Sequence, residues 1–217
     1  MKKRLRQLLK QQETAEIAEW AARRHRVLST LISLTFDADP LTAWRAIEAA
    51  GVATERIAQD DPDCVRDHLR RLYWLLSEES GGVCWRAPEI MAEIIRRRPT
   101  LFADYTPIVV SLINEMAEED LDYFRTGALW AIGRLGAVVG DHVEVVLPAI
   151  NSALDHSDPQ VRGMAVWCLE QVGRAELLVG RADLLADEAA VDLYEDGVLK
   201  HTSVGQLVRR AIGDGAE

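Results

Sequence analysis

One segment of the chain repeats itself after 37 residues, and this repeat restricts the fold more than any other feature. Residues 104–136 align with residues 141–173 without any insertion. The identical pairs are Asp104/Asp141, Val109/Val146, Ile113/Ile150, Asn114/Asn151, Arg125/Arg162, Ala128/Ala165, Trp130/Trp167 and Gly136/Gly173. A repeat of this length is typical of stacked structural units, each of which buries its apolar face against its neighbours.

Each copy of the repeat has the pattern of two consecutive helices. Apolar side chains recur with the period of an α-helix in the first half of each copy and again in the second half. Asp158-Pro159 is a favourable helix start, because aspartate caps free backbone N–H groups and proline fits the first turn. Gly136 and Gly173 stand where a helix ends in a left-handed conformation. The repeat therefore predicts stacked helix pairs.

The second helix of each copy carries a family resemblance. The strings 158-DPQVRGMAVWCLEQVG-173 and 120-DLDYFRTGALWAIGRLG-136 resemble the second helix of HEAT and HEAT-like repeats, in which an Asp precedes the helix and Val-Arg opens it. The resemblance implies an α-α superhelix of the armadillo type. It implies no reaction, because this scaffold serves binding proteins, assembly factors and some enzymes.

Upstream of residue 100 the repeat is weaker and its register is open between offsets of 37 and 39 residues. Asp61-Pro62 opens a predicted helix, and a second is predicted from about Arg86 to Arg97. The side chains expected to face inward from the first are Val65, Leu69, Leu72, Tyr73 and Leu76. Further upstream the pattern predicts a helix from Pro40 to Gly51 and a long helix over residues 14–35.

The last part of the chain departs from helical periodicity. Asp196-Gly197 lies between short runs of Val, Leu and Tyr, which is typical of a two-residue β-hairpin turn. Ser203 and Gln206 then have the spacing of a capping box at the start of a short helix. We expect the hairpin to pack on the helices of its own chain, because a single hairpin is marginally stable alone.

These patterns predict an all-α fold, a HEAT-like solenoid of about four to five helix pairs with a small C-terminal β-hairpin and helix. We expect residues 1–217 to form a single domain. Its parts are atypical N-terminal capping helices over residues 1–60, repeat units over 61–173 and a C-terminal cap over 174–217. Terminal units of a repeat array differ from the others because they cover the apolar end of the stack.

Charge and cysteine content restrict the partners. Residues 1–30 carry eight Lys/Arg and three Glu, whereas the remaining residues carry 17 Lys/Arg and 32 Asp/Glu, for an overall formal charge of −10. An acidic body repels a phosphate backbone, so we expect a protein partner rather than nucleic acid.

No apolar run approaches the roughly 18 residues that span a bilayer, so no membrane association is expected. Three widely spaced cysteines are typical of reduced thiols, and we predict a cytoplasmic protein.

Catalytic and metal-binding patterns are weak. Cys84 lies in 80-SGGVCWRAPEIM-91, a setting similar to that of some thiol enzymes, but no histidine has a recognisable partner pattern. We therefore interpret residues 77–83 as a turn between two helices. The sequence lacks HExxH, Cys-x-x-Cys and the His-Glu dipeptides of iron hydroxylases built on HEAT-like repeats. We predict no catalytic residue, no metal and no cofactor.

Arg125 and Arg162 are candidate binding residues because they occupy one repeat position. The family resemblance implies a structural ladder, in which each arginine pairs with an aspartate near a helix start, such as Asp120, Asp122 or Asp158. The alternative is a pair of guanidinium groups presented to an anionic partner.

Trp130 and Trp167 are also equivalent in the repeat, and they have two interpretations. They either pack between adjacent units or form an aromatic ladder on an exposed groove, where large rigid side chains would bind a partner. Trp85 and Arg86, next to the 77–83 turn, complete the candidate contact residues.

The sequence as a whole predicts a binding or assembly scaffold that presents a helical groove to a protein partner. One alternative is an accessory factor or lyase of the phycobilin-lyase type, which also has HEAT-like repeats and acts on a protein-bound cofactor. The other is an enzyme similar to the HEAT-like DNA glycosylases, which would require a basic groove on an acidic body.

Overall fold

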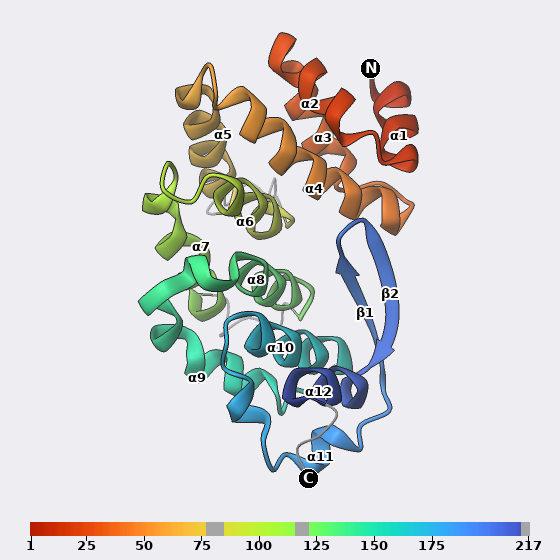
Figure 1. Cartoon of the computed structure of the whole chain (residues 1–217), viewed down its shortest axis with the longest axis vertical. Helices are drawn as coiled ribbons and strands as arrows, with labels where there is room; N and C mark the ends of the chain where they lie inside the picture. Colours follow the sequence, from red (N-terminus) through yellow and green to blue (C-terminus); the bar gives the residue numbers. More distant parts are fainter. Residues whose placement is uncertain (77–84, 116–121, 214–217) are drawn as a thin grey trace. The chain divides into compact units, whose positions relative to one another are not determined.

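The computed structural model describes residues 1–76, 85–115 and 122–213, and helices account for most of these residues (Figure 1). The chain divides into two compact units, each with buried side chains of its own. The first contains Met1–Tyr105 with Asp196–Val198, and the second contains Thr106–Glu195 with Leu199–Glu217. The single domain expected over residues 1–217 stays a prediction.

The first unit is built around its longest helix, α4, against which α2, α3 and α6 pack. Its helices are α1 (Lys2–Gln11), α2 (Thr14–Arg23), α3 (Arg26–Leu34), α4 (Pro40–Ile57), α5 (Pro62–Trp74) and α6 (Ala87–Arg97), followed by the 3-10 turn η1 (Ala103–Tyr105). The predicted start of α5 is confirmed: a carboxylate oxygen of Asp61 accepts the Cys64 N–H at 3.0 Å, and Pro62 occupies the first turn.

Three expectations for this unit are wrong. Residues 14–35 form two helices, because Arg24 leaves the helical conformation with φ −152° and ψ 90°, and both halves can then pack on α4. α4 does not end at Gly51 but continues to Ile57. A Cβ on Gly51 would lie 2.9 Å from the Glu93 carbonyl oxygen, so this glycine allows α4 and α6 to pack closely. Tyr73, expected to face inward, is 43% exposed.

The second unit contains the two clear repeats, and the predicted helix pairs are confirmed. Its elements are α7 (Thr106–Glu115), α8 (Asp122–Leu135), the 3-10 helix η2 (Gly136–His142), α9 (Val143–Ala153), α10 (Pro159–Gln171), the 3-10 turn η3 (Ala175–Leu178), α11 (Ala182–Leu185), β1 (Ala190–Glu195), β2 (Val198–Ser203) and α12 (Val204–Ile212). α7 and α9 begin 37 residues apart, and so do α8 and α10. Gly136 and Gly173 have φ values of 53° and 72°, as expected for left-handed helix ends.

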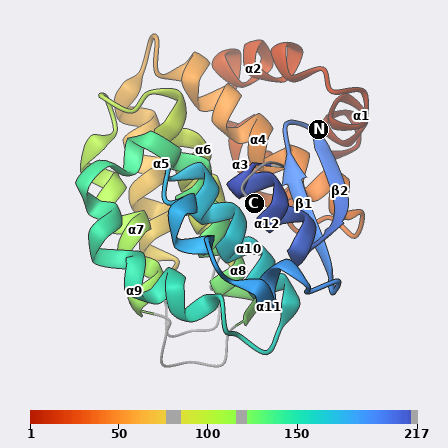
Figure 2. The ribbon, with the colours of Figure 1, turned by 60° about the horizontal axis from the view of Figure 1, so that its bottom comes forward.

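These four helices form two layers within the second unit. α7 packs on α9 in one layer, and α8 packs on α10 in the other (Figure 2). Aligned stacking of successive pairs is the arrangement that HEAT-like repeats imply. α12 lies against the side of α10, where it covers apolar surface of the last helix pair.

The C-terminal hairpin and helix are also confirmed. Asp196 and Gly197 have φ values of 45° and 82°, the left-handed pair that a type I′ turn requires. Ser203 caps α12 by accepting the Gln206 N–H at 3.3 Å. The Gln206 side chain does not complete the box, since its carbonyl oxygen accepts a hydrogen bond from the Thr202 hydroxyl.

Candidate functional site

Trp130 and Trp167 lie at equivalent positions of α8 and α10 and are buried. Their side chains are 0% and 1% exposed, with ring centroids 6.2 Å apart and ring planes inclined by 13°. A Cβ on Gly133 would lie 2.5 Å from the Trp167 ring, so the glycine provides the space in which the second indole packs on α8. The repeated tryptophans thus connect the two helix pairs as packing residues.

The hairpin covers this aromatic pair on the side away from α7 and α9 (Figures 1 and 2). The Trp130 indole N–H donates to the Tyr194 carbonyl at 3.1 Å, and that of Trp167 donates to the Glu195 carboxylate at 2.8 Å. Gly163 of α10 permits the close approach, because a Cβ there would lie 2.5 Å from Val191. A partner does not reach the two tryptophans while the hairpin is in this position.

Glu195 at the end of β1 receives hydrogen bonds from three directions. Besides Trp167, Lys200 donates to it at 2.7 Å and Arg210 of α12 at 3.0 Å. Burial acts to raise the pKa of Glu195, but the hydrogen bonds from Lys200, Trp167 and Arg210 outweigh it and hold the pKa below its ordinary value. This carboxylate therefore joins β1, β2, α10 and α12.

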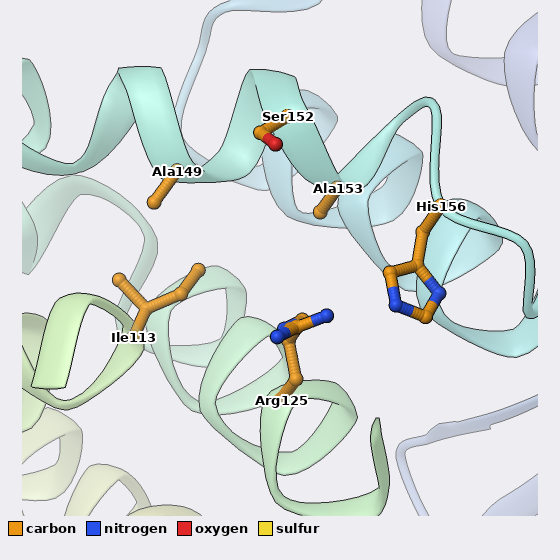
Figure 3. Close-up of a pocket in the computed structure, with 6 residues that line it drawn as sticks. All are labelled: Ile113, Arg125, Ala149, Ser152, Ala153 and His156. Carbon is orange, nitrogen blue, oxygen red and sulfur yellow. The ribbon is translucent and has the colours of Figure 1, made fainter. Parts of the chain in front are cut away.

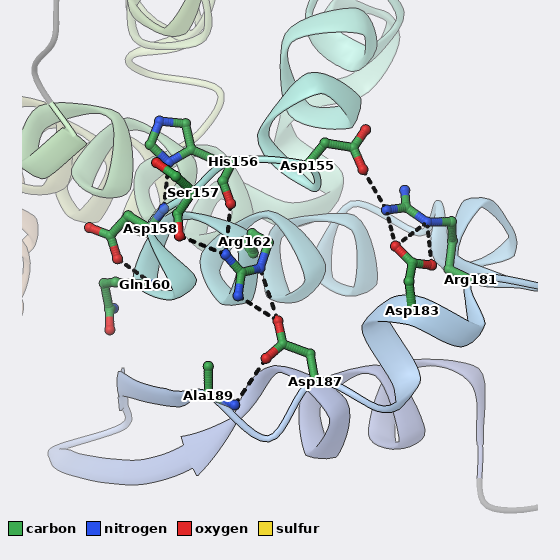
Figure 4. Close-up of polar contacts among 10 residues, drawn as sticks. All are labelled: Asp155, His156, Ser157, Asp158, Gln160, Arg162, Arg181, Asp183, Asp187 and Ala189. Carbon is green, nitrogen blue, oxygen red and sulfur yellow. Dashed lines mark hydrogen bonds and ion pairs between the residues drawn. The ribbon is translucent and has the colours of Figure 1, made fainter.

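Arg162 binds a chain segment that the ladder interpretation did not include (Figure 4). Two of its nitrogens donate to the Asp187 carboxylate at 2.9 and 2.6 Å, and a third donates to the carbonyls of His156 and Ser157. Asp158, a predicted partner, instead caps α10 by accepting the Gln160 N–H at 2.8 Å. The guanidinium therefore connects the start of α10 to the segment that leads into β1, which is a structural role.

A second arginine fixes the neighbouring segment in the same region (Figure 4). Arg181 donates to Asp155 at 2.6 Å and to Asp183 at 2.7 Å. Hydrogen bonds from Arg181 are the main reason that the pKa of Asp183 falls to about 2. These ion pairs place the η3–α11 segment against the end of α9.

Arg125 has a different environment from its repeat equivalent. It lines a cavity of about 310 Å³ together with Ile113, Ala149, Ser152, Ala153 and His156. Figure 3 shows its guanidinium directed toward the His156 ring, from the opposite wall of the cavity. Arg125 is thus a candidate residue that lines a cavity.

Trp85 and Arg86 are half-buried at the start of α6. The Arg86 guanidinium lies 4.6 Å from the ring centroid of Trp44 and donates to Glu89 at 2.9 Å. Glu89 is fully buried, which raises its pKa, and Arg86 opposes that effect. Arg86 thus has partners within the first unit, whereas Cys84 and the 77–83 turn lie outside the described residues.

The first unit contains a groove between α3 and α5 that the sequence did not indicate. It consists of two adjoining cavities, one of about 120 Å³ between the helices and one of about 420 Å³ at the start of α5, and both are lined by His68 and Arg71. Ser29, Ile32, Leu72 and Leu75 complete the lining of the smaller cavity. We call these two cavities the α3–α5 groove.

Trp74 is 59% exposed and precedes Leu75, which lines the smaller cavity of the α3–α5 groove. It follows Arg71 by three residues, which places both on the same side of the helix. Trp74 was not among the side chains expected to face inward from α5.

A cluster with metal-ligand chemistry lies at the start of α5. One ligand atom each from His25, Asp61 and Cys64 lies within 4.8 Å of the others. The Cys64 sulfur and the His25 Nδ1 are 3.3 Å apart. Sequence spacing did not reveal the cluster because the cysteine and the histidine are 39 residues apart and meet only through the packing of two helices.

Other proteins are similar to this chain in sequence. An uncharacterized protein of Archaeoglobus fulgidus is 25% identical over 185 residues, which cover 83% of this chain and 92% of that protein. A 4-hydroxy-tetrahydrodipicolinate reductase of Alkalilimnicola ehrlichii is 32% identical over 103 residues, but these cover 42% of this chain and 39% of that protein.

None of the helices in the described ranges has the length and apolar character needed to cross a bilayer. Residues 122–172, from the start of α8 to the end of α10, match the HEAT-like repeat family. The match covers the two helices that carry the stacked tryptophans, together with η2 and α9 between them. This segment is therefore similar to HEAT-like repeats, and the mostly helical fold of the described residues is consistent with such repeats.

Proposed function

We propose that the chain is a protein-binding scaffold and that its partner docks in the α3–α5 groove. The observation that carries this proposal is the 59% exposure of Trp74, which directly precedes Leu75 in the lining of the smaller cavity. Tryptophan is enriched among the residues that dominate binding energy, and a neighbouring cavity gives an apolar side chain of the partner a place to be buried. The α8–α10 layer contributes less to this function, since the hairpin covers its tryptophans.

The chemistry of the groove indicates the kind of side chain it accepts. Ile32, Leu72 and Leu75 provide apolar walls, and Arg71 provides a cation at the margin. Burial, with Arg71 and His25 adding to it, lowers the pKa of His68, so its ring is neutral at pH 7 and can accept or donate a hydrogen bond. We therefore expect the partner to place an apolar side chain against the apolar walls. A carboxylate or a backbone carbonyl next to that side chain would accept hydrogen bonds from Arg71 or His68.

The test is affinity capture of cellular proteins by the full chain, followed by mass spectrometry. Trp74→Ala and Ser29→Arg, which places a long cation at the groove, should lose the proteins that the unmodified chain retains. Tyr73→Ala is the matched control, because Tyr73 is an exposed aromatic residue on the same helix, turned about 100° away from Trp74.

Retention of the same proteins by both groove variants would exclude the α3–α5 groove as the docking surface. If Tyr73→Ala lost the same proteins, the binding would be non-specific and due to the exposed aromatic side chains of α5. The Arg125 cavity provides a further comparison, and Arg125→Ala should leave capture unchanged if the groove is the docking surface.

A further inference from the structure

Three residues at the start of α5 bring together the three side-chain types that bind zinc in proteins. His25 lies at the junction of α2 and α3, Cys64 lies in the first turn of α5, and Asp61 is the cap of that helix. Thiolate sulfur, imidazole nitrogen and carboxylate oxygen are the ligands that Zn²⁺ prefers. We propose that His25, Asp61 and Cys64 bind one Zn²⁺ ion.

The spacing of the cluster agrees with that of a tetrahedral site. A zinc ion lies about 2.3 Å from a cysteine sulfur and about 2.0 Å from a histidine nitrogen, so two such ligands are about 3.5 Å apart. The Cys64 sulfur and the His25 Nδ1 are 3.3 Å apart. The two softest ligands thus already have nearly the separation that the metal imposes.

Asp61 is fixed by its role as a helix cap. Its Oδ1 accepts the Cys64 N–H at 3.0 Å, which holds the carboxylate next to the thiol. A carboxylate has two oxygens, so Asp61 can coordinate the ion through one while the other keeps the cap. A ligand that the fold already orients loses little conformational entropy when the metal binds.

The adjoining cavity leaves room for a fourth ligand of the zinc ion. Its carboxylates also give it a negative electrostatic potential, which attracts a cation. It has a volume of about 420 Å³ and is lined by Asp61, Asp63, Cys64, Asp67, His68 and Arg71. Its three carboxylates outnumber its one guanidinium, although an ion pair with Arg70 at 2.6 Å partly neutralises Asp67. Three protein ligands with an open fourth position are typical of zinc sites that exchange water or bind a further ligand.

The same cysteine and histidine have an alternative interpretation as a nucleophile and its base. A thiol nucleophile requires a low pKa, but burial raises the pKa of Cys64, and the nearby Asp61 and Asp67 raise it further. Those carboxylates oppose a lone thiolate but attract a divalent cation. When Zn²⁺ binds, the thiol proton is released to solvent and the sulfur coordinates the ion as thiolate.

The experiment is a titration of the purified, chelator-treated full chain with Zn²⁺ in competition with a chromophoric chelator. We expect one equivalent to bind, and we expect Cys64→Ser and His25→Gln each to lower the affinity by at least about tenfold. Co²⁺ serves as the spectroscopic probe. A sulfur-to-cobalt charge-transfer band should be present in the unmodified chain and absent in Cys64→Ser.

Two control variants test whether a cysteine or a histidine elsewhere in the chain binds the zinc ion instead. Cys84→Ser removes a different thiol, and His201→Ala removes an exposed histidine that pairs with Asp192. Both should leave the zinc affinity and the cobalt band unchanged. His25 and Cys64 are not buried in the core, so circular dichroism should show the same helical content in all variants.

The proposal fails if less than one equivalent of Zn²⁺ binds in the presence of the chelator. It also fails if Cys64→Ser and His25→Gln bind as tightly as the unmodified chain, or if the cobalt band survives in Cys64→Ser but disappears in Cys84→Ser.

Discussion

Trp130 and Trp167, one repeat apart in the sequence, stack on each other with ring centroids 6.2 Å apart. The repeat explains this relationship, because stacking of successive helix pairs brings equivalent positions together. Both indole N–H groups, which a buried ring must satisfy, donate to the end of β1. The repeat residues and the hairpin therefore form one core. Substitutions in this core should change the free energy of unfolding in the ways described below.

Replacing Trp167 by alanine should lower the free energy of unfolding by about 3–5 kcal/mol, because it removes a buried aromatic side chain and leaves the Glu195 carboxylate without one of its donors. Urea denaturation followed by circular dichroism measures the change. Trp74→Ala is the control, since an exposed side chain should cost no more than about 0.5 kcal/mol. Equal effects of the two substitutions would contradict the assignment of Trp167 to the core.

Gly163→Ala should destabilise the second unit by about 1–3 kcal/mol, because the added Cβ would lie 2.5 Å from Val191 and would push β1 away from α10. The double variant Gly163→Ala/Val191→Ala tests this cause, since shortening the valine relieves the overlap. The two changes should then cost less together than the sum of their separate effects. Simple additivity would show that the hairpin does not pack on α10 at this point.

The Arg162–Asp187 ion pair should show measurable coupling. The two side chains are 18% and 17% exposed, and two nitrogens of the guanidinium bind one carboxylate oxygen. A double-mutant cycle with Arg162→Gln and Asp187→Asn should give a coupling energy of about 1–3 kcal/mol. The exposed pair Arg209–Glu188 is the comparison, and its coupling should stay below about 1 kcal/mol.

Glu195→Gln should remove a pH-dependent part of the stability. The pKa of Glu195 is lower in the folded chain than its ordinary value of 4.5, so the carboxylate stabilises the fold above that pH. As the pH falls through the folded pKa, the carboxylate is protonated and this contribution is lost. Denaturation from pH 7 to pH 3 should therefore show a difference between the unmodified chain and Glu195→Gln that shrinks toward acid. A difference independent of pH would contradict this role of the charge.

The sequence was sufficient for those parts of the fold that depend on local periodicity. The helix pairs of residues 104–173, the caps at Asp61 and Asp158 and the turn at Asp196-Gly197 follow from residue type and spacing. The break at Arg24 did not follow, because nothing in the local sequence marks it and packing on α4 compensates for it. Gly51 ended a predicted helix because a glycine weakens a helix, and only the neighbouring α6 explains why α4 continues.

The candidate site was less predictable than the fold. The repeat singled out Trp130, Trp167 and Arg162 as candidate residues, but it contained no information on the hairpin and the Asp187 segment that contact them. The α3–α5 groove and the His25–Cys64 contact depend on tertiary packing between helices that are far apart in sequence. Such contacts have no signature in a single sequence, whereas a repeated residue does.

The bond from Trp130 to Tyr194 spans 64 residues, and it has a consequence for the order in which the chain acquires its structure. α8 and α10 precede β1 in the chain, so during synthesis both indoles are made before the acceptors that β1 provides. Contacts of large sequence separation form late, and exposed apolar surface favours aggregation in that interval. β1 thus completes the burial of two side chains that precede it in the chain, and a chain truncated before β1 should expose both indoles.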